Sequence, residues 1–252
     1  MSELTNTITF LDQRVRIVRK HRVRRMTLSI RADRPLQVTS NLGTSEGEIL
    51  HFLNSNIKWI QKNLAKIEEF NKNFKIPTWE EASLFPVLGE MKYLTYSETK
   101  KPKLFFAVED GFIICYLPKN TKKSDFPLVE LEKALHKFYK TKATHYLELR
   151  MQHWIFSTGL KPAKLKFGRA TTRWGSCNSK KQIVLNWKLI CHAPSLIDYV
   201  IVHELCHLQF LNHSDLFWNL LAKFMPEYLT YEKILNQEVA LSGFLNSLNS
   251  VS

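Results

Sequence analysis

The sequence predicts an α+β fold with a small β-rich N-terminal lobe and a C-terminal lobe of helices and a short sheet. Three observations predict it. The first 40 residues alternate apolar and charged side chains as strands do, a long helical pattern follows residue 127, and a hairpin and two helices come after that. We divide the chain into a basic, β-rich region with one helix (1–125) and a second domain (126–252).

The N-terminal elements carry recognisable boundary signals. Residues 44–70 are predicted to form one helix, in which Ser45 and Glu48 resemble a capping box. Residues 71–86, which contain two prolines, are predicted to be a linker. Short strands follow up to residue 118, as the alternating segments there indicate.

The second domain is predicted to begin with a helix that starts near Pro127 and ends at Gly159, a residue suited to the left-handed position after a helix. Two segments that alternate like paired strands come next, KLKFGRA and QIVLNWKLI, joined by a loop of turn-forming residues. The remaining residues predict two helices separated by a short break.

The net charge of +13 predicts an attraction to polyanions. The excess is concentrated in two segments. Residues 14–34 hold nine Lys and Arg, and residues 149–197 hold nine more with no Asp or Glu. The first segment could bind nucleic acid, and the second leads up to the candidate active site, where an acidic substrate or partner is expected.

The compartment is predicted from three absences in the sequence. No apolar run approaches the roughly 20 residues that a membrane-spanning helix needs, and the N-terminus lacks a signal-peptide pattern. The four cysteines form no C-x-x-C pair, which is typical of reduced thiols. We therefore expect a cytoplasmic protein with no membrane association, and no oligomeric state follows from the sequence.

Residues 203–207 carry the candidate chemistry. His203 and His207 are four residues apart on a predicted helix, so their Cβ atoms lie about 5–6 Å apart on one side. Zinc–nitrogen bonds of about 2.0–2.1 Å let both imidazoles bind one ion. Glu204 lies beside the pair, where it can reach a metal-bound water without ligating the metal. This H-E-x-x-H arrangement predicts a zinc-dependent hydrolase in which Glu204 is the catalytic acid and base.

A catalytic zinc usually has three protein ligands and one open position. His213 follows the second histidine by six residues, the spacing of the H-E-x-x-H-x-x-G-x-x-H class, although Phe210 occupies the glycine position. Carboxylates further along, Glu227 and Asp215, are the alternatives. We favour His213 as the third ligand and interpret Asp215 as compensation of a helix dipole. Imidazole ligands in this motif favour zinc over other divalent ions.

These residues and a block upstream resemble the YgjP-like metallopeptidase family, a relative of the SprT-like zinc proteases. The resemblance implies a zincin-type fold, with His203, His207 and His213 as metal ligands and Glu204 as catalytic acid and base. The matching blocks are Arg173–Cys177, Leu185–Trp187, His203–Leu208, Asn212–Ser214, Phe217–Trp218 and Met225–Pro226.

The upstream block receives roles of its own. In zincin-like sites a strand commonly lies beside the metal helix and offers its edge to an extended substrate, and residues 182–187 are the predicted strand. Arg173, on the preceding loop, is a candidate catalytic residue that could hold a carboxylate, a phosphate or a developing oxyanion; a structural salt bridge is the alternative.

Three functions remain open from the sequence. The first is a peptidase that cleaves amide bonds with a zinc-activated water. The second is a nucleoside triphosphate pyrophosphohydrolase on the same site, in which basic side chains of residues 149–197 neutralise phosphates. The third is a nucleic-acid-associated metalloprotein that uses the basic N-terminal strands.

Overall fold

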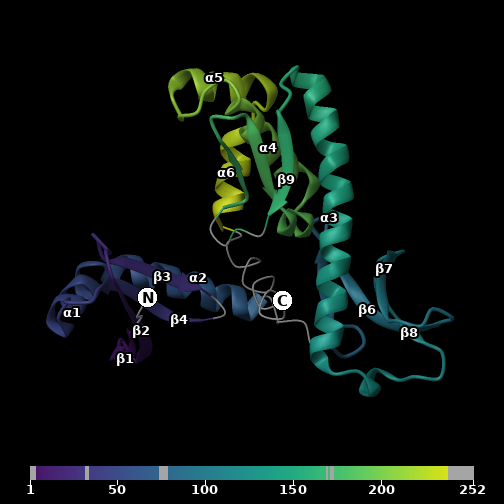
Figure 1. Cartoon of the computed structure of the whole chain (residues 1–252), viewed down its shortest axis with the longest axis horizontal. Helices are drawn as coiled ribbons and strands as arrows, with labels where there is room; N and C mark the ends of the chain where they lie inside the picture. The colour runs from purple at the N-terminus through teal and green to yellow at the C-terminus, as the bar shows by residue number, and fades with distance from the viewer. Residues whose placement is uncertain (1–3, 32–33, 74–78, 169, 171–172, 238–252) are drawn as a thin grey trace. The chain divides into compact units, whose positions relative to one another are not determined.

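The computed structural model describes residues 4–31, 34–73, 79–168, 170 and 173–237. The chain forms two compact units, Met1–Ile76 and Pro77–Ser252, here called the N-terminal and C-terminal units. Both contain strands and helices (Figure 1), so the α+β class predicted from the sequence is confirmed. No helix within the described residues is long and apolar enough to cross a bilayer.

The N-terminal unit is a four-stranded sheet with two helices on one face. The strand order is β1-β2-β4-β3, with β2 parallel to β4 and the other neighbours antiparallel. Val15, Ile17 and Val38 of the sheet pack with Ile49 and Ile60 of the helices in one buried cluster. The elements are β1 (Leu4–Phe10), β2 (Gln13–Lys20), β3 (Thr27–Arg31), β4 (Arg34–Asn41), α1 (Glu46–Ser55) and α2 (Ile57–Asn73).

The helical part of this unit differs from the single helix predicted for residues 44–70. The capping box is present, because the Ser45 side chain accepts from the Glu48 N–H and the Glu48 carboxylate accepts from the Ser45 N–H. At Asn56, however, the backbone leaves the helical region (φ −110°, ψ 14°), and α1 ends there. The two shorter helices let Leu53 and Ile60 both reach the sheet.

The C-terminal unit is organised along the long helix α3 (Leu128–Thr158), which starts after Pro127 and ends at Gly159 with φ 71°, as predicted. A four-stranded sheet, ordered β5-β6-β8-β7, packs against it through β7. The strands are β5 (Leu84–Val87), β6 (Glu90–Thr99), β7 (Phe105–Glu109) and β8 (Phe112–Pro118), followed by the 3-10 turn η1 (Lys123–Asp125).

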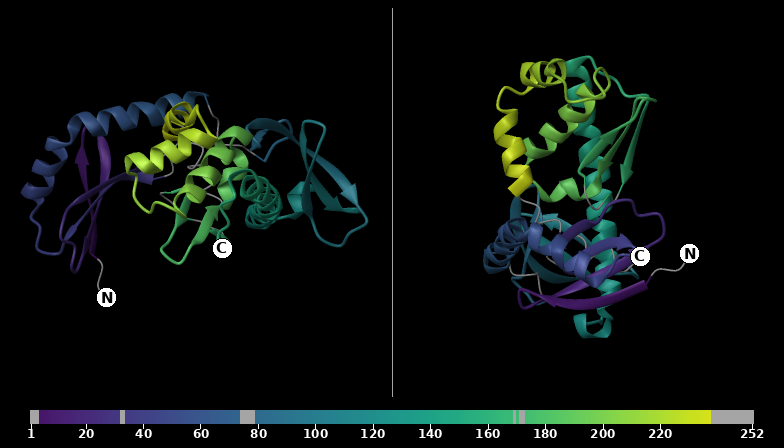
Figure 2. Two further views of the ribbon diagram at one scale, coloured as in Figure 1. Left: turned by 90° about the horizontal axis from the view of Figure 1, so that it is seen from above. Right: turned by 90° about the vertical axis from the view of Figure 1, so that its left-hand side faces the viewer.

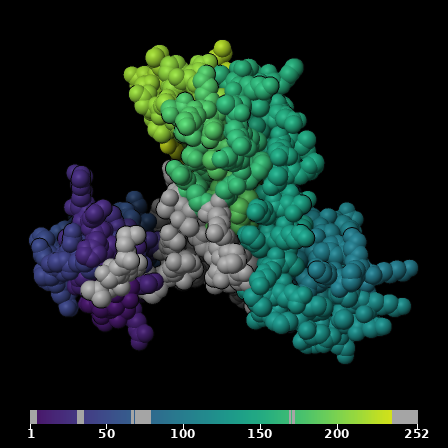
Figure 3. Space-filling view, viewed as in Figure 1, coloured from purple at the N-terminus to yellow at the C-terminus, as the bar shows by residue number. Residues whose placement is uncertain are grey.

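A second sheet, a 3-10 turn and three helices lie towards the other end of α3 (Figure 2), and of these the 3-10 turn and the first helix pack directly against it. In the space-filling view these green residues lie beside the teal residues of α3 (Figure 3). The second sheet has the order β10-β11-β9, with β11 parallel to β9 and antiparallel to β10. Its elements are β9 (Lys164–Gly168), β10 (Gly175–Cys177), β11 (Gln182–Asn186), the 3-10 turn η2 (Trp187–Cys191), α4 (Pro194–Cys206), α5 (Asp215–Phe224) and α6 (Tyr228–Gln237).

The boundary between the units lies between Ile76 and Pro77, whereas the sequence analysis placed it between residues 125 and 126. The reason is a set of hydrogen bonds that ties the β5–β6 turn to the residues before α4. Leu88 and Gly89 donate their N–H groups to the carbonyls of Ile190 and Cys191 at 2.6 and 3.2 Å. The sheet of β5–β8 therefore belongs with the helices of residues 126–237.

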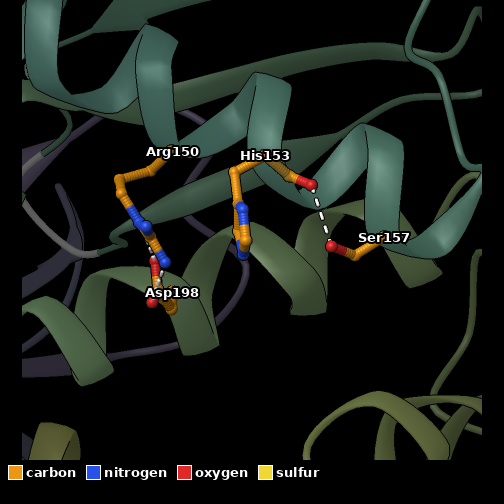
Figure 4. A network of polar contacts seen from close by, with 4 residues as sticks. All are labelled: Arg150, His153, Ser157 and Asp198. Carbon is orange, nitrogen blue, oxygen red and sulfur yellow. Dashed lines mark hydrogen bonds and ion pairs between the residues drawn. The ribbon is translucent and has the colours of Figure 1, made fainter.

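One ion pair fixes α4 against α3 (Figure 4). Arg150 donates from Nε and from one terminal nitrogen to the two carboxylate oxygens of Asp198, at 2.8 and 2.6 Å. The arrangement is bidentate and only partly exposed, with side-chain exposures of 29% for Arg150 and 13% for Asp198. Such charge-assisted pairs add directional specificity as well as energy. The helix that carries the H-E-x-x-H residues is thereby held in one orientation.

Removing one member of this pair should destabilise the protein. We expect Asp198→Ala to lower the free energy of unfolding by about 2 kcal/mol, less than for a fully buried pair, because water can reach the partly exposed Arg150 once its partner is removed. The double variant Arg150→Met with Asp198→Leu should lose less, since it leaves no unpaired charge. Urea denaturation of both variants measures this, and equal losses would contradict the ion pair's role.

Candidate metal centre

Three histidine side chains converge at the end of α4. The Nε2 atom of His203 lies 3.2 Å from Nε2 of His207 and 3.1 Å from Nε2 of His213. Two nitrogens at about 2.0–2.1 Å from one zinc, at a tetrahedral angle, lie roughly 3.3 Å apart. These rings are therefore spaced as ligands of a single ion, and among the described residues they form the group that could hold a metal.

The local sequence explains the convergence. His203 stands on the last turn of α4 and His207 caps its end, so the four-residue spacing puts both on one side. The chain then turns, and His213 comes immediately before α5, whose N-cap is Ser214. Glu227 and Asp215 are not part of this group; the Glu227 carboxylate instead accepts a hydrogen bond from the Tyr231 hydroxyl.

The orientation of His207 is set by a backbone carbonyl. Its Nδ1 lies 2.9 Å from the carbonyl oxygen of Phe210, which can only accept, so Nδ1 carries the proton and Nε2 is free to ligate. Hydrogen bonds from the non-ligating nitrogen fix the tautomer of metal-binding histidines. Phe210, which replaces the glycine of the longer motif, contributes through its backbone.

Helix α5 supplies an aromatic layer behind the histidines. Phe217 stacks on His207 with ring centroids 4.5 Å apart, and Trp218 stacks on His213 at 5.4 Å. Phe217 is fully buried. The two rings restrict the imidazoles to the orientation in which their nitrogens meet. These two residues had no predicted role, although an aromatic pair on the helix next to a ligand was a signal for one.

Burial keeps two of the histidines, His203 and His207, neutral. It lowers the pKa of His203 to about 3, with further lowering by the charges of His207 and His213. Burial also lowers the pKa of His207. Neutral imidazoles are the form that binds metal, so at neutral pH protons do not compete for these two rings. The Nδ1 atom of His203 is buried and has no hydrogen-bond partner among the described residues.

Glu204 points into a tight space between α4 and β10. Its side chain is 5% exposed, and one carboxylate oxygen, Oε2, lacks a hydrogen-bond partner among the described residues. Burial raises the pKa of this carboxyl to about 8, while the positive charge of Arg173 acts in the opposite direction. A carboxyl with a pKa near neutrality, beside three potential ligands, is suited to accept and return a proton.

Gly175 makes this placement of Glu204 possible. A Cβ atom at residue 175 would lie 2.5 Å from Oε1 of Glu204 and 2.7 Å from its Cγ, distances that real side chains do not tolerate. The backbone of β10 thus packs directly on the carboxyl. Gly175 lies in one of the family blocks and had no predicted role, yet an isolated glycine in a strand is a general signal of close approach.

Arg173 lies near Glu204, and its guanidinium makes no hydrogen bond or ion pair among the described residues. It is exposed, and its influence on Glu204 is electrostatic. The Asn186 side-chain amide donates to the carbonyls of Ala170 and Arg173 at 2.8 and 3.1 Å, which holds the backbone at these two residues. The described residues place no carboxylate in ion-pair contact with the Arg173 guanidinium, so the salt-bridge alternative has no partner there.

The prediction that residues 182–187 offer a strand edge to the substrate is wrong. In the structure β11 is the central strand of its sheet, with β10 on one side and β9 on the other, so both its edges are occupied. The edge next to α4 belongs to β10. Alternation of apolar residues predicted a strand here, but it carries no information about which strand lies at the edge.

Comparisons with known proteins agree with the geometry. The family described as "YgjP-like, metallopeptidase domain" matches residues 24–238, which is most of the sequence. The chain belongs to the YgjP-like family. The resemblance noted from the sequence blocks is thereby confirmed, and at the level of the family this YgjP-like protein is a metallopeptidase, hence a hydrolase that uses a metal ion.

No curated protein matches the chain. Among solved structures, the metallopeptidase zymogen of Methanocaldococcus jannaschii jannalysin is similar at 21% sequence identity and a TM-score of 0.34, over 37% of this chain and 96% of that chain.

Proposed function

We propose that this protein is a zinc-dependent peptidase in which His203, His207 and His213 hold the ion and Glu204 is the general acid and base. The observation that carries the proposal is the convergence of three imidazole nitrogens beside a buried carboxyl. A zinc ion held by these rings would polarise the scissile carbonyl and lower the pKa of a bound water towards about 7. Glu204 takes the proton from the attacking water and delivers it to the leaving amine.

The edge of β10 is suited to align an extended peptide. Trp174 and Asn178, on either side of β10, are hydrogen-bonded to Asn186 and Gln182 on the strand β11 side. Because antiparallel strands bond at alternate residues, the backbone groups of Gly175 and Cys177 face away from β11. A substrate strand added at this edge would run past Glu204, and its main-chain hydrogen bonds would supply affinity without side-chain specificity.

Arg173 completes the proposed site. Its guanidinium is exposed on the loop before β10 and lies close enough to Glu204 to affect that residue's pKa. From this position it can stabilise the developing negative charge on the carbonyl oxygen or hold a substrate carboxylate. The proposal therefore keeps Arg173 as a substrate-contacting residue.

Phosphoanhydride hydrolysis on the same site receives less support. Lys164 and Lys166 are in register with Gln182 and Val184, and these residues face away from the side of the sheet on which Gly175 meets Glu204. Two more basic residues of segment 149–197 are not placed to bind a phosphate. Arg150 binds Asp198, and Lys188 is buried.

The test compares zinc-loaded and chelated protein on unstructured peptides and on nucleoside triphosphates. We expect peptide cleavage that disappears on chelation and returns with one equivalent of zinc. His213→Ala should lose stoichiometric zinc, whereas Asp215→Ala, an exposed neighbour, should retain it. Metal-dependent release of phosphate or pyrophosphate without peptide cleavage would replace the proposal with the alternative activity.

A further inference from the structure

The N-terminal sheet has a face that its helices do not cover. The apolar residues Val15, Ile17 and Val38 face α1 and α2 and form the core. Residues that alternate with them point to the opposite side. On β2 these include Arg14 and Arg16, and both are exposed.

The pairing of the strands arranges these outward residues in rows. Thr7, Arg16, Gln37 and Ser29 are aligned across all four strands, one residue from each. Neighbouring rows continue the pattern. We call this surface the open sheet face; it comprises Thr5, Thr7, Thr9, Arg14, Arg16, Lys20, Thr27, Ser29, Gln37, Thr39 and Asn41, with the buried Val18 among them.

The chemistry of the open sheet face is uniform. Every polar side chain on it can donate a hydrogen bond, three (Arg14, Arg16 and Lys20) carry a positive charge, and none of its described residues is acidic or aromatic. Phosphate groups are acceptors with a negative charge, so they match such a surface both in charge and in hydrogen bonding. The surrounding charge reinforces the match, since residues 14–34 hold nine Lys and Arg against one Asp.

From these observations we propose that the open sheet face binds the phosphate backbone of double-stranded DNA without reading its sequence. The hydrogen-bond donors are hydroxyls, two amides and three cationic side chains on a sheet, which suits contacts to the outside of a duplex. Recognition of single strands relies on aromatic rings that stack on bases, and this face carries none. Insertion into a lipid surface needs exposed apolar side chains, which are also absent from it. Recognition of an RNA duplex relies on 2′-hydroxyl contacts across its minor groove, whereas the contacts proposed here are to phosphates alone, so we assign the face to duplex DNA and use duplex RNA as the competitor that tests this.

The open sheet face shares no residue with the candidate metal centre. Its residues belong to the N-terminal unit, while all the residues of the candidate metal centre belong to the C-terminal unit. Binding should therefore persist when the metal is removed. The DNA contact would bring the hydrolytic unit to substrates held on DNA, in addition to whatever the metal centre itself recognises.

The test is fluorescence anisotropy of the full chain with a short labelled DNA duplex of mixed sequence, over about 50–200 mM salt. The variant Arg14→Gln/Arg16→Gln should weaken binding about tenfold and reduce the salt slope by about 2, because it removes two phosphate contacts. Its melting temperature should match the wild type, since both side chains are exposed. Unlabelled RNA duplex and single-stranded DNA should compete less well than DNA duplex.

The matched control is Lys58→Gln/Lys62→Gln, which removes the same charge from exposed positions of α2, on the helix layer of the same unit. It should retain most of the affinity. Equal losses in the two double variants would reduce the effect to net charge and overturn the assignment to this face. Absence of duplex binding by the wild type at the lowest salt, or tighter binding of single strands, would also overturn it.

Discussion

Replacing Glu204 by glutamine should reduce peptide turnover by at least about 10³-fold while leaving zinc bound, because general acid–base groups contribute roughly 10²–10⁴-fold to catalysis. The substitution keeps the volume of a side chain that is 5% exposed and packs against β10, so the fold should be preserved. The amide can neither take the proton from water nor return it to the leaving amine. Steady-state kinetics together with zinc stoichiometry measure both halves of the expectation.

The matched control is Glu232→Gln, the same chemical change on α6, which should leave turnover unchanged. A Glu204→Gln protein that binds zinc, melts normally and still cleaves peptides within tenfold of the wild-type rate would remove Glu204 from the mechanism. Loss of zinc from this variant would instead make the residue a ligand.

The same variant reports on the ionisation of Glu204 in the metal-free protein. In the folded protein, burial raises the pKa of the Glu204 carboxyl from 4.5 to about 8. The folded protein therefore holds a proton that the unfolded chain releases. Stability is therefore lost as pH rises through this range, at roughly 1.4 kcal/mol for each pKa unit. The lowered pKa of His203 acts in the opposite sense, but only between about 3 and 6.5. Between pH 6.5 and 8, chelated wild type should lose stability relative to Glu204→Gln.

Substitution of Gly175 by alanine should lower kcat by about 10²-fold, the loss that a displacement of about 1 Å can cause. The new Cβ would lie 2.5 Å from Oε1 of Glu204, so either the carboxyl or β10 has to move. The histidines do not contact residue 175 in this way, and zinc stoichiometry should stay at one. Kinetics with a saturating peptide separate the effect on kcat from the effect on KM.

Gly168→Ala provides a control in the same sheet. Its Cβ would approach Cγ1 of Val184 at 2.9 Å, a similar crowding at a site that does not involve Glu204. It should affect thermal stability without a comparable loss of kcat. If both alanine variants lose activity in proportion to their loss of stability, the effect of Gly175 is a general disturbance of the sheet and its placement of Glu204 is not special.

Much of the candidate site could be predicted because its information is local. His203, Glu204 and His207 share one helical turn, and a helix converts that spacing into one geometry whatever surrounds it. The capping box at Ser45 and the glycine after α3 are local signals of the same kind.

The remainder depends on contacts between residues far apart in the chain. The sequence does not reveal that β11 lies between two other strands, because alternation describes the faces of a strand and not its neighbours. The contact between Gly175 and Glu204 and the unit boundary at residue 76 depend on tertiary packing in the same way. The break at Asn56 arises because tertiary packing outweighs the helical propensity of the segment.

The bonds from the β5–β6 turn to the residues before α4 limit how the chain can be shortened. The Tyr139 hydroxyl on α3 donates to the Pro86 carbonyl at 3.0 Å, and Gly89 touches Ala193 at the start of the metal helix. A fragment starting at residue 126 would leave this buried hydroxyl and the carbonyls of Ile190 and Cys191 without their partners. The smallest autonomous catalytic fragment therefore starts near residue 77, and β5–β8 should exchange their amide hydrogens in the same cooperative opening as α4.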